Sequence, residues 1–167
     1  MLFKLLARAG LPLLALAALA APAQAQLGAD AAACRAGQPS ILVNVIGLAR
    51  RTGNIRVALY GNPNTFLERG QTMRKINVPV PTSGPLRVCI AVPHPGQYAI
   101  AVRHDVDGDN ARGDWSDGGG FSRNPRLSLI HLRPSFGDVA VNVGRTVLGV
   151  NVVLNYRYGL SIRPANG

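Results

Sequence analysis

The stretch VLGVNVVLNY at residues 147–156 decides the fold class of this chain. Every second side chain from Leu148 to Tyr156 is apolar, and Gly149, Asn151 and Asn155 lie between them. Side chains that alternate with period two lie on the two faces of a β-strand, whereas an amphipathic helix repeats about every 3.6 residues. The pattern therefore predicts a strand with one face in the hydrophobic core.

The same alternation recurs in short runs that are separated by Gly, Pro and Asn. It predicts strands at residues 40–48, 55–60, 73–80, 86–92, 97–104, 138–143 and 147–156. The inner faces of these strands supply the expected core residues: Ile55, Val57, Leu59, Leu86, Val88, Ile90, Val92, Tyr98, Ile100, Val102, Leu148, Val150, Val152, Leu154 and Tyr156. We expect an all-β fold, a single antiparallel β-sandwich of about seven strands with one long Asp- and Gly-rich loop.

Turn-forming residues lie between several of these runs. Residues 51–54 are expected to join the first two strands, residues 93–96 the fourth and fifth, and Gly144-Arg145 the last two. Strands joined in this way are expected to pair antiparallel. Between residues 61 and 72, Thr65 and Glu68 have the spacing of a capping box, which predicts one helical turn.

The first 25 residues have the three parts of a secretory signal. Lys4 and Arg8 form a basic start, residues 11–21 are apolar, and Ala23-Gln24-Ala25 matches an Ala-x-Ala cleavage site. We expect residues 1–25 to be removed from an exported protein, periplasmic or extracellular. No transmembrane segment should remain, because an apolar run of 11 residues is too short to span a bilayer. Residues 26–39 then form an irregular N-terminal arm, and residues 40–160 form the β-sandwich domain.

The chain is strongly basic. After removal of Lys4 and Arg8, 16 basic residues remain against eight acidic ones, a net charge of +8. The Arg residues are scattered and no aromatic RNA-binding motif accompanies them, so nucleic acid is not an expected partner. We expect instead that the basic surface contacts an anionic envelope component or another protein. The alternative is a basic surface that is solvated and has no specific partner.

Two cysteines, Cys34 and Cys89, remain after processing. An even number in an exported chain predicts one disulfide, which would tie the N-terminal arm to a strand in mid-sequence. It would close a loop of about 56 residues, worth roughly 4 kcal/mol of chain entropy. Two alternatives are a lipidation box at residues 31–34 and a catalytic thiol with His94 as its base.

Five of the eight acidic residues lie in one connection after the strand at 97–104: Asp105, Asp107, Asp109, Asp114 and Asp117. With one Arg, this segment carries a charge of −4, and the rest of the mature chain carries +12. Carboxylates this close repel one another unless a cation lies between them.

The first three carboxylates match the ligand spacing of a D-x-D-x-D calcium loop, with Asn110 able to adopt the left-handed turn of its usual glycine. Ser116 stands where an EF-hand has its Glu, so Asp114 or Asp117 would have to complete a Ca²⁺ site. The alternative is an exposed acidic loop that is partly neutralised by Arg103, Arg112 or Arg123.

The residues around this loop resemble those of a known family. His104-Asp105 with Asp107, Asp109 and Asn110, followed by Gly120-Phe121-Ser122 and Asn124, is similar to the exported bacterial proteins grouped as domain of unknown function 2141. The resemblance covers about residues 40–156 and implies a transthyretin-like or immunoglobulin-like sandwich, with no established activity. Such proteins tend to carry Asn where Asp107 and Asp109 stand. His104, Phe121 and Asn124 are expected to anchor the loop.

We expect a non-enzymatic protein. The alternative is a carbohydrate-active or hydrolytic enzyme that uses His104, the Asp cluster and Trp115, because glycoside hydrolysis requires two carboxylates. Ser122 lies in no G-x-S-x-G turn, and the three His residues lack zinc-ligand spacing. Trp115 is expected to cap the edge of the sandwich, whereas in the enzyme alternative it stacks on a sugar ring.

Overall fold

The computed structural model describes residues 28–110 and 114–165, so the predicted signal peptide lies outside the described residues. These residues form short helices and ten strands: α1 (Ala31–Arg35), β1 (Ser40–Ile46), β2 (Asn54–Tyr60), the 3-10 helix η1 (Pro63–Thr65), β3 (Arg74–Pro79), β4 (Leu86–Ala91), β5 (Gly96–Asp105), β6 (Gly118–Phe121), α2 (Phe136–Val139), β7 (Val141–Val143), β8 (Val147–Val153), β9 (Asn155–Tyr158) and β10 (Ser161–Pro164). None of the helices in the described ranges is long and apolar enough to cross a membrane.

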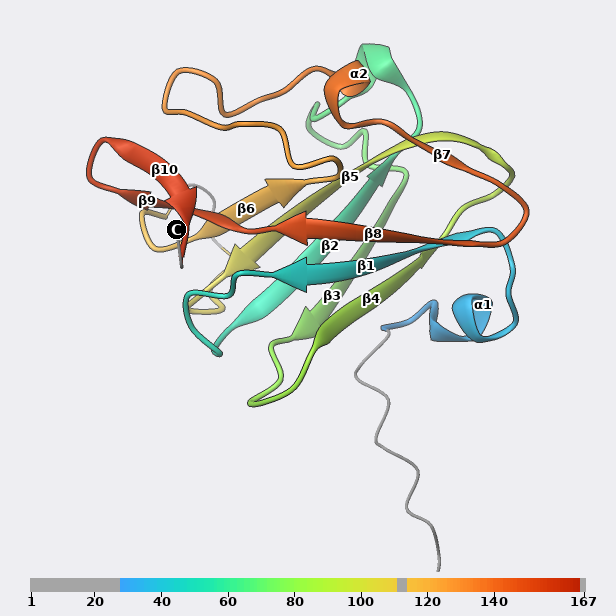
Figure 1. Ribbon diagram of the computed structural model, residues 1–167, viewed down its shortest axis with the longest axis horizontal. Helices are drawn as coiled ribbons and strands as arrows, with labels where there is room; N and C mark the ends of the chain where they lie inside the picture. The colour runs from blue at the N-terminus through green and yellow to red at the C-terminus, as the bar shows by residue number, and fades with distance from the viewer. Residues whose placement is uncertain (1–27, 111–113, 166–167) are drawn as a thin grey trace, which may run out of the picture.

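The strands form two sheets that face each other (Figure 1). The smaller sheet has the order β4-β1-β8, and the larger has the order β10-β9-β6-β5-β2-β3, with β7 paired to one end of β5. The β-rich class is confirmed. The smaller sheet is mixed rather than antiparallel, because β1 pairs antiparallel with β4 but parallel with β8.

The three predicted hairpins do not form. The connections at residues 51–54, 93–96 and 144–145 each lead from one sheet to the other, joining β1 to β2, β4 to β5 and β7 to β8. Turn residues show that the chain reverses, but the same residues serve reversals within a sheet and between sheets. Each of these strands has one apolar face, and a facing sheet is needed to cover it.

Several elements differ from the predicted ones. The last predicted strand is divided at Leu154 into β8 and β9, which belong to different sheets. Residues 136–139 form α2 rather than the start of a strand, because Ser135 and Asp138 form a capping box. The helical turn expected at Thr65–Glu68 lies earlier, as η1, with Asn62 as its N-cap. Sequence alternation predicts neither β6 nor β10, which are short.

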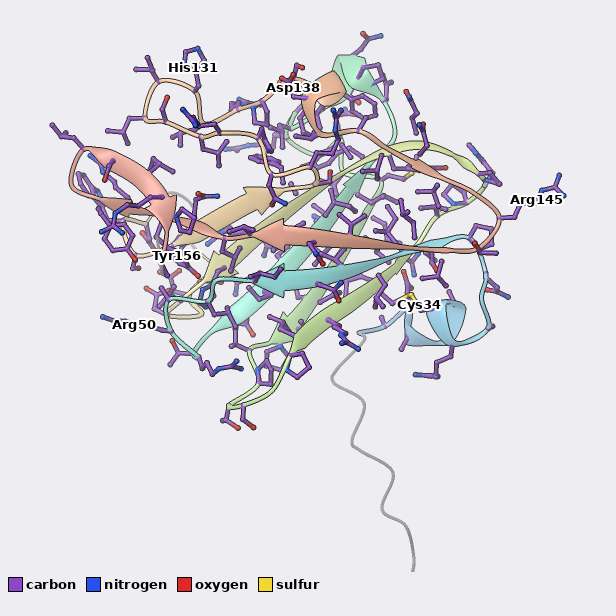
Figure 2. All side chains as sticks on the ribbon, viewed as in Figure 1. Cys34, Arg50, His131, Asp138, Arg145 and Tyr156 are labelled. Atoms are coloured by element: carbon purple, nitrogen blue, oxygen red, sulfur yellow. A yellow bond between two sulfur atoms is a disulfide. The ribbon has the colours of Figure 1, made fainter. Side chains whose placement is uncertain are left out.

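The N-terminal arm is attached to the sheets at two points. The predicted disulfide between Cys34 and Cys89 is present and joins α1, which replaces the expected irregular segment, to β4 (Figure 2). Asp30, only 7% exposed, accepts hydrogen bonds from the Arg74 guanidinium and from the Ala91 N–H. The hydrogen bond to Asp30 raises the pKa of Arg74 above its ordinary value.

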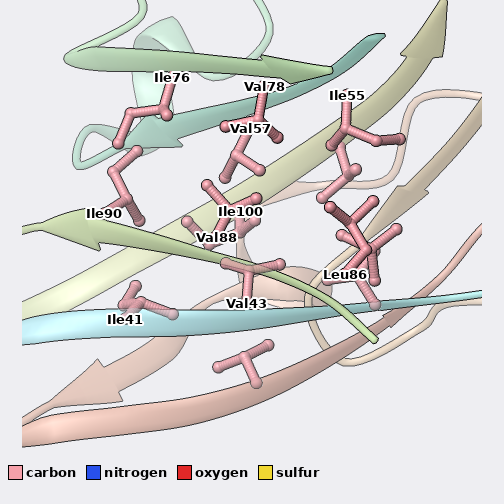
Figure 3. Packing of buried hydrophobic residues seen from close by; sticks show 14 of the residues in the cluster. Ile41, Val43, Ile55, Val57, Ile76, Val78, Leu86, Val88, Ile90 and Ile100 are labelled. Carbon is pink, nitrogen blue, oxygen red and sulfur yellow. The ribbon is translucent and has the colours of Figure 1, made fainter. Parts of the chain in front are cut away.

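The main hydrophobic core fills the space between the two sheets (Figure 3). Ile41, Val43, Val88 and Ile90 project from the smaller sheet toward side chains of β2, β3 and β5. Every predicted core residue is buried except Leu148, which is partly buried and packs against the core. The alternation pattern therefore identified the inner faces correctly even where the predicted strand pairing was wrong.

A smaller apolar cluster lies on the outer face of the larger sheet, the face directed away from the smaller sheet. Phe66 is its centre and makes edge-on contacts with the rings of Tyr60, Phe136 and Phe121 at centroid distances of 5.2, 5.8 and 6.3 Å. Aromatic rings in this arrangement attract each other beyond the area that they bury. The cluster thus holds α2 and the segment after η1 on the sheet.

Candidate functional site

The Asp loop, residues 105–117, joins the end of β5 to the start of β6, and residues 111–113 within it lie outside the described part. The β1–β2 connection supports its base. Thr52 Oγ1 donates a hydrogen bond to the Val106 carbonyl at 2.9 Å. Gly53 has a φ of +70°, and a Cβ at this position would lie 1.9 Å from the Asp105 carbonyl oxygen. Only glycine permits so close a contact.

Asp105 and Asp117 hold the loop in shape. The two carboxylate oxygens of Asp105, which is 3% exposed, accept hydrogen bonds from the N–H groups of Gly108 and Asn110, each at 3.1 Å. Asn110 has a φ of +61°, so the predicted left-handed turn is confirmed. Asp117 accepts a hydrogen bond from the Val106 N–H and pairs with Arg103 at 2.9 Å. Both carboxylates are therefore fixed before any ligand binds.

The structure brings all five predicted carboxylates together in two overlapping groups. In the first, one oxygen each from Asp105, Asp107 and Asp109 lie within 4.8 Å of one another. In the second, oxygens from Asp107, Asp114 and Asp117 lie equally close, so Asp107 belongs to both groups. Asp114 and Asp117 thus lie where the residues that complete the site were expected. The two Asp clusters could hold a metal ion.

Repulsion between these carboxylates affects Asp114 directly. Partial desolvation, followed by the charges of Asp109, Asp107 and Asp117, raises the pKa of Asp114 above its ordinary value, although Arg103 acts in the opposite direction. A raised carboxyl pKa means that the charged form is disfavoured in the folded protein. A cation among these oxygens would relieve that cost.

The donor chemistry fits a hard cation. All five candidate ligands are carboxylates, and calcium takes about six to eight oxygen ligands, whereas zinc prefers nitrogen and sulfur. Both cysteines form the disulfide, and both nitrogens of the fully buried His104 already have hydrogen-bond partners, so these donors are not available to the loop. Of the three arginines considered as neutralising charges, Arg103 pairs with the loop, Arg123 donates to the Gly137 carbonyl, and Arg112 lies outside the described residues.

His104 does not face the Asp loop. Its Nε2 lies 2.9 Å from the Thr52 carbonyl oxygen and its Nδ1 lies 2.7 Å from the Tyr156 hydroxyl. A carbonyl can only accept, so Nε2 donates to Thr52; in the tautomer that carries its proton on Nε2, Nδ1 accepts from the Tyr156 hydroxyl. The Tyr156 oxygen in turn accepts from the Ala49 N–H at 3.2 Å. His104 therefore anchors the β1–β2 connection to β9.

Ser122 is equally committed to structure. It is fully buried, and its hydroxyl donates to the Val139 carbonyl and accepts from the Ile100 N–H. Neither nitrogen of His104 bonds to this hydroxyl in the described structure, so the residues lack the hydrogen bond of a Ser–His nucleophile.

Asn124 and Phe121 attach the segment that follows β6. The Asn124 side chain accepts from the Val153 N–H at 2.7 Å and donates to the Asn151 carbonyl at 3.0 Å, which extends the hydrogen bonding of β8. Phe121 packs in the outer apolar cluster through Phe66. Phe121 and Asn124 therefore anchor the segment that follows β6. They do not contact the carboxylates of the Asp loop in the interactions described.

Trp115 does not cap the edge of the sheets, because 70% of its surface is exposed. The guanidinium carbon of Arg157 lies 3.4 Å from the centroid of its ring, an arrangement that holds the indole at the surface. Together with Asp114 and Asp117, Trp115 lines a cavity of about 330 Å³, here called the Trp115 cavity. Part of its wall comes from three residues after β6 that the sequence patterns did not single out: Leu127, Leu129 and Leu132. Single apolar residues in a loop carry no periodic signal.

Comparisons with known proteins identify the family. Neither the curated proteins nor the solved structures contain a match to this chain. Residues 43–150 match a family model described as an uncharacterized protein conserved in bacteria, DUF2141. The matched range begins within β1, ends within β8 and includes the entire Asp loop. The chain therefore belongs to this bacterial family, as the residues around His104 and the Asp loop had suggested.

Proposed function

We propose that this protein is a non-enzymatic, exported module of the bacterial envelope, that calcium stabilises its Asp loop, and that its basic surface contacts an anionic envelope component or another protein. The observation that supports the calcium assignment is the presence of two clusters of three carboxylates each, which have Asp107 in common. The two facing sheets support a transthyretin-like or immunoglobulin-like sandwich as the scaffold. The disulfide supports export, because such bonds persist in oxidising compartments.

In this proposal the five Asp carboxylates have different roles. Asp105 and Asp117 orient the loop, since backbone N–H groups and Arg103 already bond to them. Asp107 and Asp109 are exposed and Asp114 is half-buried, so their oxygens are accessible to an ion from solvent. Bound calcium would reduce the repulsion between these carboxylates.

Terbium luminescence tests the calcium site. Tb³⁺ occupies calcium sites. Trp115, the only Trp in the chain, is next to Asp114 in the sequence and can transfer excitation energy to a terbium ion bound there. We expect Trp-sensitised emission that calcium displaces and that Asp107→Asn with Asp109→Asn abolishes. The matched control is Glu68→Gln, because Glu68 is an exposed carboxylate outside the loop. Emission that is equal in all three proteins would contradict the assignment.

The anionic partner has its own test. The charge of +12 outside the Asp loop should attract anionic surfaces, and salt should screen that attraction. We expect binding to vesicles of anionic phospholipid at low ionic strength and a marked loss of binding at high ionic strength. Binding that does not change with salt would exclude an electrostatic surface interaction.

A carbohydrate-active enzyme is the second candidate, favoured by one observation. The exposed Trp115 lines a cavity together with Asp114 and Asp117, and their carboxylate oxygens lie within 4.8 Å of each other. Against hydrolysis, Asp117 already pairs with Arg103 and with a backbone N–H, which weakens it as a nucleophile or proton acceptor. Release of nitrophenol from nitrophenyl glycosides, and its loss in Asp114→Asn, would establish this candidate instead.

A further inference from the structure

A second cavity lies beside the Trp115 cavity on the outer face of the larger sheet. It has a volume of about 530 Å³, and the two cavities share Val102, Arg103 and Phe121 in their walls. We call it the basic cavity, because its lining contains one carboxylate, Glu68, and five cationic side chains. The cations are Arg56, Arg69, Lys75, Arg103 and Arg133.

The strand register explains how this surface is built. One transverse row runs from Lys75 on β3 through Ala58 and Ala101 to Phe121 on β6. These small central side chains leave room above the sheet, and together they form the floor of the basic cavity. Because Lys75 and Phe121 stand at opposite ends of this row, the surface changes from cationic to apolar along it.

The neighbouring row places two like charges opposite each other. Arg56 on β2 lies directly across from Arg103 on β5, and Gly119 and Asn155 continue the row. Like charges at paired positions of an antiparallel sheet are unfavourable. Arg103 pairs with Asp117, whereas the partners of Arg56 among the described residues are the neutral side-chain oxygens of Asn77 and Asn110.

Two further cations complete the charge excess. In the described structure Lys75 and Arg69 are exposed and neither has a carboxylate partner, while Arg133 forms a surface pair with Glu68 at 3.3 Å. Arg56, Arg69 and Lys75 thus line one cavity without a neutralising acid. An anion that enters the cavity would contact these three cationic side chains. The electrostatic field in such a concave site is stronger than on a flat surface.

The Trp115 cavity has the opposite character. Its walls are mainly apolar and include Leu127, Leu129, Leu132 and Ile162. Gly119 lies on its floor, and a Cβ there would meet only the Val102 carbonyl oxygen, at 3.5 Å. Unlike Gly118 and Gly120, whose Cβ atoms would overlap Tyr156 and Val153, Gly119 accepts a side chain that would project into this space.

We propose that the outer face of the larger sheet binds an amphipathic anion, a molecule with a phosphate or carboxylate head and one aliphatic chain. The head lies in the basic cavity near Arg56, Arg69 and Lys75, and the chain extends past Phe121 into the Trp115 cavity. This inference rests on the proposed function for the anionic nature of the partner and specifies its chemistry. A free inorganic anion would bind only in the basic cavity, and a neutral sugar only in the Trp115 cavity.

Titration calorimetry and Trp115 fluorescence with decyl phosphate, below its micellar concentration, test the proposal. We expect a 1:1 complex, with inorganic phosphate and decanol each binding at least roughly tenfold more weakly. The double variant Arg69→Gln with Lys75→Gln should weaken decyl phosphate and inorganic phosphate alike. Gly119→Leu should weaken decyl phosphate but leave inorganic phosphate unchanged.

Two variants serve as matched controls. Arg145→Gln removes an exposed cation at the β7–β8 turn, far from the labelled Tyr156 (Figure 2), and Gly149→Leu adds the same side chain to an exposed strand position with open space around it. Both should bind decyl phosphate as the wild type does.

The outcomes separate this inference from the proposed function. Equal affinity for decyl phosphate and decanol, or no effect of Gly119→Leu on decyl phosphate, overturns the two-cavity site. Salt-sensitive binding to anionic vesicles without binding of decyl phosphate also overturns it, but leaves the basic surface of the proposed function intact. Absence of both kinds of binding contradicts both, whereas the terbium experiment bears on the calcium assignment alone.

Discussion

Replacing Tyr156 by Phe tests the hydrogen-bond chain that holds the base of the Asp loop. The substitution leaves Nδ1 of the fully buried His104 without a donor, and an unsatisfied buried polar atom costs about 2 kcal/mol. The Ala49 N–H also loses its acceptor, but Ala49 is exposed and water can replace the hydroxyl. In a domain of about 140 residues, this loss should lower the midpoint of thermal unfolding by roughly 7 °C at neutral pH.

The pH dependence makes this prediction specific. Burial raises the pKa of Tyr156 to about 12, whereas an unfolded tyrosine titrates near 10. Because the folded pKa is raised, the unfolded chain releases the proton first as pH rises, and stability is lost from about pH 10 upward. The wild type should lose about 1.4 kcal/mol by pH 11 relative to Tyr156→Phe, since one pKa unit corresponds to about that energy.

Urea denaturation of both proteins between pH 7 and pH 11 measures this difference. The advantage of the wild type should be constant up to about pH 9 and should then shrink as the pH rises toward 11. Parallel stability curves for the two proteins over the whole range would refute the assignment of Tyr156 as a buried hydroxyl donor to His104.

Four further changes test other parts of the structure. Calcium at about a hundred times its dissociation constant should add about 2.7 kcal/mol, so thermal melts should shift upward by roughly 5 to 12 °C; superimposed melts with and without chelator would rule out the site. Asp107→Ala with Asp109→Ala should abolish the shift and raise the calcium-free midpoint, because it relieves carboxylate repulsion. Reduction of the disulfide, whose cysteines are 55 residues apart, should lower the free energy of unfolding in urea by about 4 kcal/mol; an unchanged urea midpoint would contradict this. Gly53→Ala should cost about 3 kcal/mol through overlap with the Asp105 carbonyl, whereas Gly149→Ala should be nearly neutral, as thermal melts of the two variants would show.

The strands were predictable because alternation is a local property. In any sheet with one buried face, every second residue must be apolar, whatever strand lies beside it. Predicted core residues such as Val57, Val88 and Ile100 are therefore buried as expected. The failures include β6, which contains three glycines, the short strand β10, and α2, whose capping box interrupts a run read as a strand.

The candidate site was predictable in its members but not in their roles. The D-x-D-x-D spacing identifies Asp105, Asp107 and Asp109 because a tight loop brings alternate residues together. The same spacing does not show that both oxygens of Asp105 accept backbone hydrogen bonds. The loop-anchoring role expected of His104 was also incomplete, because its partners Thr52 and Tyr156 each lie 52 residues away along the chain.

Local patterns in this sequence determined most of the strands, which side chains enter the core, which residues form the disulfide and which carboxylates gather in one loop. Only the tertiary structure decided that β1 lies parallel to β8, that three expected hairpins pass between sheets, and that Arg56 stands opposite Arg103 on a concave face. The physical reason is that alternation and turn residues depend on near neighbours. The choice of a strand's partner depends instead on covering apolar faces throughout the chain, as the pairing of Ser40 with Val147 illustrates.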